Sequence, residues 1–202
     1  MRRLRESDVA ADPIVQFRAW WEDARATGDP WADAMVLATV SADGAPSARA
    51  VILRQLDERG FGFFTDTRSA KAGEIEANTR VALVALWSAL ERQVRVTGHA
   101  ALVSDDEAEA FFAERPRDTK LAAHACVQGE LIAGPEVLER RLREITAAHE
   151  GRPVGRPPGW GGYRVTPDAV ELWQSSPDLL HDRLRYRRDS DTGGWHIERL
   201  AP

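Results

Sequence analysis

Cationic side chains suited to binding anions recur along the chain. Arginine and lysine bind phosphate oxygens through charge-assisted hydrogen bonds, and the planar arginine fork can bind two oxygens at once. Arg49 and Arg54 bracket one apolar run, and Lys71 lies near an expected helix start. The other cations of this kind are Arg115, Arg117 and Arg183. These residue types indicate a site for phosphorylated ligands.

Several common catalytic motifs are absent from the sequence. It contains no G-x-S-x-G, no P-loop, no G-x-G-x-x-G and no H-E-x-x-H. The five histidines are not spaced as metal ligands, and Cys126 is the only cysteine, which excludes an internal disulfide, a CxxC redox pair and a thiolate zinc cluster. We therefore expect no metal, and any redox chemistry must be carried by a cofactor.

Length and composition indicate one compact domain over residues 1–202, with residues 1–11 as a flexible N-terminus. No apolar run approaches the roughly 20 residues needed to cross a bilayer, and the N-terminus does not resemble a secretory signal. These features predict a soluble, cytoplasmic protein. The net charge of −5 gives no general attraction to nucleic acid.

The N-terminal half reads as one helix followed by a series of short strands. Asp12 and Pro13 predict a helix start, and the apolar face that follows contains Ile14, Phe17, Trp20, Trp21 and Ala24. Apolar, β-branched runs then predict strands over residues 35–40, 48–53, 60–65 and 81–87. Turn residues at 41–44 and 57–60 are typical of antiparallel hairpins.

Helices and further strands are expected around this sheet. Residues 69–78 predict a short helix capped by Ser69, whose N-terminus could hold an anion. Alternation over 93–100 predicts a strand that turns Gln93 toward a site. A capping box at Ser104 and the Gly134-Pro135 pair predict two more helices that flank the barrel.

The C-terminal quarter returns to strands after a loop rich in Gly, Pro and Arg at 151–162. The expected strands cover 163–165, 170–173, 184–187 and 195–200, with a turn at 191–194. The fold class is therefore α+β, dominated by an antiparallel barrel.

Several motifs occur in an order that resembles the pyridoxamine 5'-phosphate oxidase family. The resemblance runs from about Asp12 to the C-terminal Ile197-Glu198-Arg199-Leu200-Ala201-Pro202. The motifs are Arg49-Ala50-Val51-Ile52-Leu53-Arg54, Phe63-Phe64-Thr65, Ser69-Ala70-Lys71, Leu90-Glu91-Arg92-Gln93-Val94, Arg115-Pro116-Arg117-Asp118, and Trp173-Gln174 followed by Leu180-His181-Asp182-Arg183. The family fold is an FMN-binding antiparallel split β-barrel with flanking helices, which agrees with the strands read from the residues.

The resemblance implies an FMN-dependent oxidase that forms a homodimer with FMN at the interface. Such an enzyme oxidises pyridoxamine or pyridoxine 5'-phosphate to pyridoxal 5'-phosphate, with dioxygen as acceptor and hydrogen peroxide as product. By position, the expected FMN contacts from one subunit are Arg49, Val51, Ile52, Phe64, Thr65, Lys71 and Gln93, while Gln128, Trp173 and Arg183 are expected to complete the cradle. Arg49 and Lys71 would neutralise the FMN phosphate, and Trp173 would offer a flat apolar wall to a ring.

The expected substrate contacts include departures from the family pattern. They are Arg54, Phe111, Arg115, Thr119, Leu179 and His181, with His181 and Arg54 as the expected catalytic residues. Arg115 matches the family's substrate-phosphate arginine, and Thr119 replaces a serine but keeps its hydroxyl. Arg54 stands where the family has lysine, and Phe111 replaces a tyrosine and loses a hydroxyl donor.

Three further departures remove polar groups. Leu179 replaces an arginine two residues before His181, on the substrate side of the flavin. Ala70 replaces an arginine and Gly129 a serine, and each change removes a possible contact to the FMN phosphate.

Two other functions therefore stay open. One is a specialised relative, such as a phenazine-biosynthesis FMN oxidase that dehydrogenates a reduced aromatic precursor, which Leu179 favours. The other is a split-barrel protein that binds flavin or another cofactor without turnover. A role at a DNA operator is weaker, because no segment combines a basic helix face with a recognition-helix arrangement.

Overall fold

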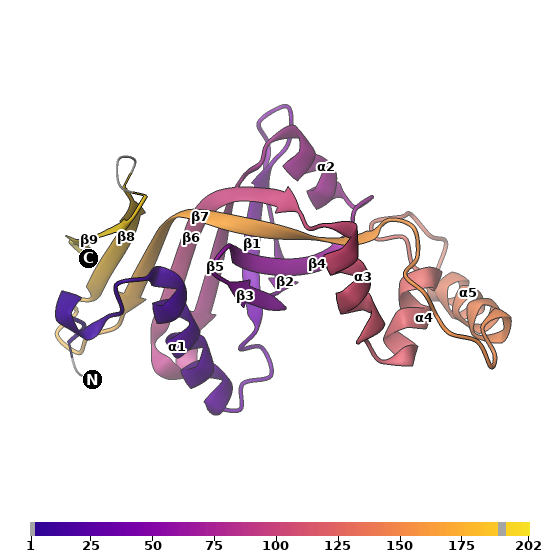
Figure 1. Cartoon of the computed structure of the whole chain (residues 1–202), viewed down its shortest axis with the longest axis horizontal. Helices are drawn as coiled ribbons and strands as arrows, with labels where there is room; N and C mark the ends of the chain where they lie inside the picture. The colour runs from indigo at the N-terminus through magenta and orange to yellow at the C-terminus, as the bar shows by residue number, and fades with distance from the viewer. Residues whose placement is uncertain (1–2, 190–192) are drawn as a thin grey trace.

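The computed structural model describes residues 3–189 and 193–202, and its centre is one curled, nine-stranded antiparallel sheet (Figure 1). Seven strands follow the order β2-β1-β5-β6-β7-β4-β3, while β8 pairs with β7 and with β9. The strands are β1 (Ala34–Val40), β2 (Pro46–Ile52), β3 (Gln55–Asp57), β4 (Gly60–Asp66), β5 (Arg80–Trp87), β6 (Arg92–Leu102), β7 (Trp160–Gln174), β8 (Asp182–Arg188) and β9 (Trp195–Leu200). The expected antiparallel barrel is confirmed as a half-barrel sheet.

The described residues form five α-helices, which lie against the sheet or at its end. They are α1 (Pro13–Ala26), α2 (Ala70–Ala77), α3 (Asp105–Ala113), α4 (Arg117–Ala125) and α5 (Pro135–Ala148), and single 3-10 turns cover Glu6–Asp8 and Ser88–Leu90. Figure 1 places α4 and α5 at one end of the molecule, while β8, β9 and both chain ends lie at the other. No helix in the described residues is long and apolar enough to cross a membrane.

Helix α1 packs as the sequence predicts. Asp12 caps it, accepting a hydrogen bond from the backbone N–H of Ile14 at 2.7 Å, and Pro13 occupies the first turn. Phe17 is fully buried, and its ring meets Phe61 edge-on at a centroid distance of 4.8 Å. The helix therefore covers the sheet with its apolar face and fixes the strands on which the site is built.

The two strands expected at 163–165 and 170–173 are one strand, β7, of 15 residues. Thr166, Pro167 and Asp168 look like a turn in the sequence, but the register between β6 and β7 shifts at Gly98, and Pro167 pairs there. A Cβ on Gly98 would lie 2.1 Å from the Thr166 carbonyl oxygen, so the close approach needs glycine. The expected loop 151–162 also ends earlier, because β7 begins at Trp160.

Several smaller expectations need correction. Ser69 lies at the N-cap of α2, but its hydroxyl donates to the Asp66 carbonyl and does not cap the helix. Helix α5 begins at Pro135 as expected but contains no buried residue, and it packs beside α4 at the end of the molecule (Figure 1). Strand β3 and helix α4 were not predicted. The expected turn at 191–194 lies partly outside the described residues.

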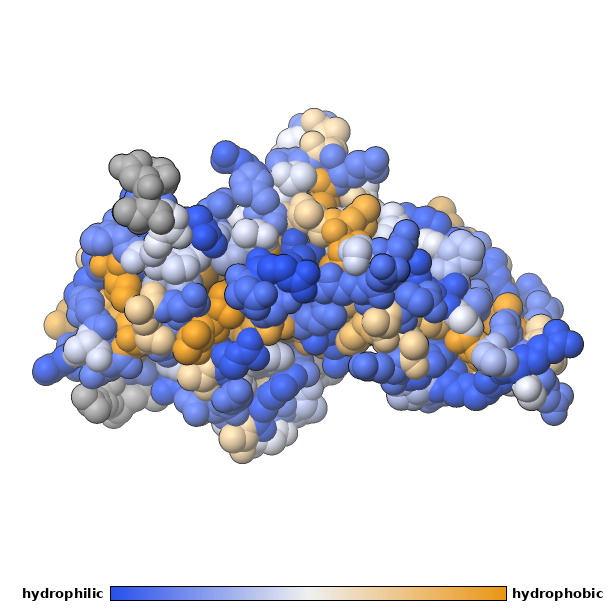
Figure 2. Space-filling view, in the orientation of Figure 1, coloured by the Kyte–Doolittle hydropathy of each residue, from blue (hydrophilic) through white to orange (hydrophobic). Residues whose placement is uncertain are grey.

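Residues near the N-terminus pack beside β8 and β9. The backbone N–H of Leu4 donates to the Asp182 carboxylate at 3.0 Å, and Leu4 is buried. The Tyr186 hydroxyl donates to the Ala10 carbonyl at 2.7 Å. The flexibility expected for residues 1–11 stays a prediction. On the face shown in Figure 2, hydrophilic residues cover most of the surface and hydrophobic residues form separate patches.

Candidate functional site

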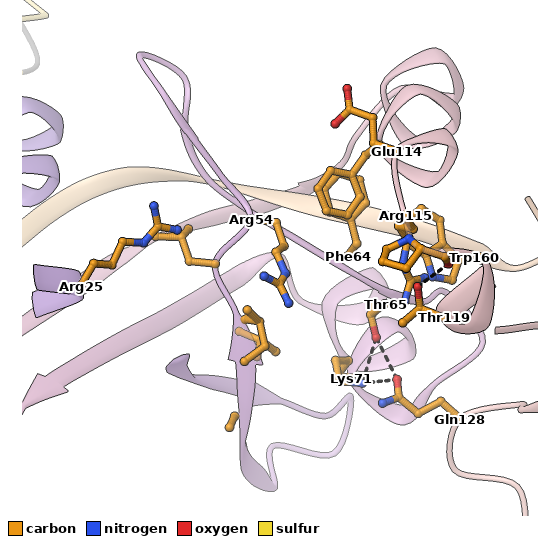
Figure 3. Close-up of a pocket in the computed structure, with 16 residues that line it drawn as sticks. Arg25, Arg54, Phe64, Thr65, Lys71, Glu114, Arg115, Thr119, Gln128 and Trp160 are labelled. Carbon is orange, nitrogen blue, oxygen red and sulfur yellow. Dashed lines mark hydrogen bonds between the residues drawn. The ribbon is translucent and has the colours of Figure 1, made fainter. Parts of the chain in front are cut away.

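One cavity, of about 720 Å³, brings together most of the predicted site residues (Figure 3). It is lined by residues of α1, β2, β4, α2, α3 and α4, of the segments that follow β2, α3 and α4, and of the start of β7. Its predicted lining residues are Val51, Ile52, Arg54, Phe64, Thr65, Lys71, Phe111, Arg115, Thr119 and Gln128. Arg25, Glu114 and Trp160 also line it and were not predicted. The wall is therefore part cationic and part aromatic, as a phosphorylated ring compound requires.

A buried ammonium forms one pole of the cavity. Lys71 is 7% exposed, and its Nζ donates to Gln128 Oε1 at 2.8 Å and to the hydroxyls of Thr65 and Ser69, each at 3.2 Å. Figure 3 shows Lys71, Thr65 and Gln128 joined in one cluster. Burial lowers the pKa of Lys71, and the nearby Arg49 lowers it further. Within the described residues, no carboxylate forms an ion pair with Lys71, which fits an anion-binding role.

Arg49 lies beside this pole. Its guanidinium pairs with Glu74 at 2.6 Å, donates to Ser47 at 2.7 Å and also contacts the Thr39 hydroxyl. The Thr39 and Arg49 contacts hold the pKa of Glu74 below its usual range. Arg49 is therefore oriented by a carboxylate of α2, although it does not line the cavity itself.

A second pole contains Arg115 and Thr119. Arg115 Nη1 is buried and has no hydrogen-bond partner in the described part of the chain. Burial lowers the pKa of Arg115, and repulsion from Arg54 adds to the effect. Two guanidinium groups that repel one another at a cavity wall would be stabilised by an anion between them. Arg117, the neighbouring cation in the sequence, instead ties α4 to the carbonyls of His149 and Arg152.

Arg54 lies near Asp33, which belongs to the segment between α1 and β1. Its guanidinium lies 3.9 Å from the Asp33 carboxylate, which also accepts a hydrogen bond from Arg25 at 2.7 Å. In Figure 3, Arg54 and Arg25 lie on the opposite side of the cavity from Arg115 and Trp160. The Arg25 hydrogen bond, together with Coulombic attraction to Arg25 and Arg54, lowers the pKa of Asp33 against the effect of its partial burial.

The remaining predicted residues lie elsewhere, around the C-terminal end of β7. They are Gln93, Trp173, Leu179, His181 and Arg183. Gln93 pairs with Trp173 across β6 and β7, and Trp173 pairs with Arg183 across β7 and β8. The His181 ring lies 4.9 Å from the Trp173 ring. Trp160 lies at the start of β7 and Trp173 near its end, a path of roughly 40 Å along the strand at about 3.3 Å per residue.

The loop before β8 fixes His181. The Ser176 backbone N–H donates to His181 Nδ1 at 3.1 Å, so Nδ1 is an acceptor and the ring proton lies on Nε2 in the neutral form. Leu179 is 75% exposed with a φ of 64°, in the left-handed region. His181 can therefore present a donor, while Leu179 presents only an apolar side chain. Arg183 is paired with Glu171 at 2.9 Å.

The donor set fits a phosphorylated cofactor and a phosphorylated substrate. A buried ammonium with neutral partners and a buried guanidinium nitrogen without a partner are costly unless an anion completes them. Lys71, Thr65 and Gln128 would receive one phosphate, and Arg115, Thr119 and Arg54 the other. No cluster of three or more His, Cys, Asp or Glu side chains suited to a metal ion occurs among the described residues.

Two family models match the sequence. Residues 30–149 match the model described as pyridoxamine 5'-phosphate oxidase, and residues 160–202 match the pyridoxine 5'-phosphate oxidase C-terminal dimerisation region. A pyridoxine/pyridoxamine 5'-phosphate oxidase from Rubrobacter xylanophilus is 51% identical, over 98% of this chain and 91% of the relative. One of the same name from Cupriavidus pinatubonensis is 49% identical, over 98% and 93%.

Two solved structures are similar over nearly the whole chain. PhzG from Burkholderia lata, in complex with tetrahydrophenazine-1-carboxylic acid, has a TM-score of 0.91 at 28% identity, covering 98% of each chain. A pyridoxamine 5'-phosphate oxidase-related, FMN-binding protein from Nostoc punctiforme has a TM-score of 0.77 at 21% identity, covering 96% of this chain and 100% of that one. The second likeness concerns the fold alone.

Proposed function

The chain belongs to the pyridoxamine 5'-phosphate oxidase family, and on that premise we propose that it oxidises pyridoxamine or pyridoxine 5'-phosphate to pyridoxal 5'-phosphate. The observation that supports this most directly is a cavity that combines two cationic poles with an aromatic wall. One pole suits the phosphate of a flavin and the other the phosphate of a substrate. The protein is an oxidoreductase, and a cytoplasmic location is part of the proposal.

The cofactor in this proposal is FMN. When bound, FMN supplies the hydride acceptor, and dioxygen takes the electrons to give hydrogen peroxide. Lys71, with Thr65 and Gln128 beside it, would bind the FMN phosphate, and Arg49 would add positive charge from β2. Val51 and Ile52 would line the ring, so that this chain contributes orientation and charge to the reaction.

The complete site is proposed to need two copies of the chain. Gln93, Trp173, His181 and Arg183 surround the far end of β7, roughly 40 Å along the strand from the cavity wall. A homodimer that brings this end of one copy to the cavity of the other would unite both groups of predicted residues at an interface. The match of residues 160–202 to a dimerisation region supports this arrangement.

His181 and Arg54 would act on the substrate. His181 keeps its Nδ1 as an acceptor for the Ser176 N–H, so its Nε2–H is free to donate to a polar atom of the substrate ring. Arg54, held by Asp33, would share the substrate phosphate with Arg115 and Thr119. These contacts orient the carbon that loses hydride, and they require no protein nucleophile.

A visible spectrum tests the proposal. Purified protein with added FMN is expected to bind the flavin, and anaerobic addition of pyridoxine 5'-phosphate should bleach its absorption. Bound flavin that stays oxidised with both phosphorylated vitamers would overturn the substrate, and a protein that binds no flavin would overturn the cofactor.

A second candidate function is oxidation of a reduced aromatic precursor of the phenazine type. Leu179, which leaves an apolar side chain where the family has an arginine, favours this function, as does the TM-score of 0.91 to PhzG. Reduction of the bound flavin by a dihydro or tetrahydro aromatic acid, but not by a vitamer phosphate, would favour the second candidate.

Replacing Leu179 with arginine tests which candidate holds. Because Leu179 is exposed and already in a left-handed conformation, the substitution adds a cation with little effect on folding. We expect kcat/KM for pyridoxine 5'-phosphate to rise about tenfold, the contribution of one charge-assisted hydrogen bond. Unchanged steady-state kinetics would mean that the missing cation does not limit this reaction.

FMN binding should weaken at alkaline pH. The decline in affinity should begin at a lower pH than it would with a lysine of ordinary pKa. Burial, with the added effect of Arg49, lowers the pKa of Lys71 from its usual 10.5. Only the charged form pairs with phosphate, so FMN affinity is full below the pKa of Lys71 in the free protein and falls as pH rises through it. Lys71→Arg keeps its charge and should flatten the decline. Fluorescence titration of FMN from neutral pH to about pH 10 measures the affinity of the wild type and of Lys71→Arg. Parallel declines in the two proteins would contradict the assignment of Lys71 to the FMN phosphate.

A further inference from the structure

Three aromatic rings form one parallel stack on the cavity wall. Phe64 of β4 lies 4.0 Å from Phe111 of α3, with planes within 1°, and 5.3 Å from Trp160 of β7, within 8°. The Phe111 and Trp160 rings are 6.2 Å apart and within 7°. The three residues are far apart in the sequence, so the sequence alone does not reveal this arrangement. The stacked rings give the cavity one rigid apolar wall.

The backbone and one arginine hold this stack in place. Gly162 pairs with Phe64 across β7 and β4, and a Cβ on Gly162 would lie 2.6 Å from Phe64 Cδ1, so the ring packs directly against the glycine. Arg156 donates to the Trp160 carbonyl at 2.8 Å and also to two carboxylates of α3. Arg156 therefore ties the start of β7 to the helix that carries Phe111.

Arg115 lies against this wall. Its guanidinium carbon is 5.1 Å from the Trp160 ring centroid and 5.6 Å from that of Phe112, whose ring meets Trp160 edge-on. Both distances lie within the range of cation–π attraction. No carboxylate pairs with Arg115 among the described residues, and its Nη1 is buried without a partner. The two rings are therefore the main restraint on the guanidinium.

We propose that Trp160 is a positioning residue that holds the Arg115 guanidinium by cation–π contact and thereby sets the affinity for the phosphate of the substrate. The inference deepens the proposed function and rests on it, because it assigns Arg115 to a phosphorylated substrate. A phosphate in the cavity would pair with the Arg115 guanidinium, which has no carboxylate partner in the described residues, whereas an unphosphorylated ring compound would not. Trp160 therefore contributes to discrimination between the two without itself reaching the phosphate.

Two substitutions at position 160 separate the π face from simple bulk. Trp160→Leu keeps an apolar side chain but removes the π face, and Trp160→Phe retains one. We expect Trp160→Leu to weaken binding of 4-deoxypyridoxine 5'-phosphate, which lacks the oxidisable group, by about tenfold. The affinity for unphosphorylated 4-deoxypyridoxine should change less than about twofold. Trp160→Phe should retain most of the wild-type affinity for the phosphorylated analogue. Spectral titration of the flavin-loaded protein measures these affinities.

Kinetics and a double substitution sharpen the test. KM for pyridoxine 5'-phosphate should rise with the dissociation constant in Trp160→Leu, while kcat stays within about twofold. In an Arg115→Ala background, Trp160→Leu should add almost nothing, because its effect passes through Arg115. The inference would be overturned if Trp160→Leu and Arg115→Ala lowered the affinity independently of one another. It would also be overturned if Trp160→Leu weakened binding of the phosphorylated and unphosphorylated analogues equally.

Trp195 provides the matched control. Arg188 lies over the Trp195 ring at 4.5 Å, so the same type of contact occurs on β9, outside the cavity. Because Trp195 lies in the proposed dimerisation region, any loss in Trp195→Leu should weaken the phosphorylated and unphosphorylated analogues alike, and a loss there confined to the phosphorylated analogue would overturn the inference. If the wild-type protein neither binds the analogue nor oxidises a vitamer phosphate, the proposed function fails. If the wild type binds the analogue and Trp160→Leu binds it equally well, only the proposed role of Trp160 is contradicted.

Discussion

Replacing Lys71 with alanine is expected to give protein that purifies without flavin, with FMN affinity lowered on the order of 100-fold, or ~2.7 kcal/mol. The ammonium is buried beneath Thr65, Ser69 and Gln128, and all three partners are neutral. A charge-assisted hydrogen bond to an anion contributes about 1.5–3 kcal/mol. Quenching of FMN fluorescence during titration measures the loss.

Lys120 is the matched control for this substitution. Its Nζ donates to the Ala113 carbonyl at 2.7 Å on an exposed part of α4, away from the Lys71 cluster. Lys120→Ala should bind FMN as the wild type does, and thermal unfolding should show that both variants fold. Wild-type affinity in Lys71→Ala would place the flavin phosphate elsewhere and remove the basis for assigning Thr65 and Gln128 to the cofactor.

The fold was largely predictable because its elements have strong local signals. Asp12 and Pro13 mark the start of α1, and the alternating burial of Val94 and Val96 identifies β6. Strand β7 was misread as two strands because Pro167 looks like a turn residue. Its pairing depends on a register shift opposite Gly98, which is a tertiary feature that local sequence does not reveal.

The sequence predicted the part of the candidate site that lies within the cavity of one copy of the chain. Family motifs located Lys71, Arg115 and most other lining residues, because motif order is preserved along the chain. Trp160 was missed because its role depends on stacking with rings of β4 and α3, and it lies in a stretch that reads as a loop. The separation of Trp173 and His181 from the cavity could not be foreseen either, since it depends on the length and path of β7.

Replacing Arg115 with alanine is expected to lower kcat/KM for pyridoxine 5'-phosphate by about 100- to 1000-fold, or ~3–4 kcal/mol, mainly through KM. The guanidinium is held against two aromatic rings with Nη1 buried and unpaired, so its interaction with a phosphate is preorganised. Arg54 would still contact the phosphate from the side of the cavity near Asp33, but it would not replace the contact that Arg115 makes from the other side (Figure 3). Steady-state kinetics with phosphorylated and unphosphorylated pyridoxine measure the effect.

The comparison with Arg117 decides what a loss at Arg115 means. Arg117 is two residues away and carries the same charge, but its guanidinium binds backbone carbonyls at the end of α5 and does not line the cavity. If general positive potential attracts the substrate, Arg117→Ala and Arg115→Ala should weaken it similarly, and both losses should shrink with added salt. If direct contact is responsible, only Arg115→Ala should affect KM, and unphosphorylated pyridoxine should be oxidised equally well by both variants. Because the two arginines differ in contacts and not in charge, that difference would assign the phosphate to Arg115.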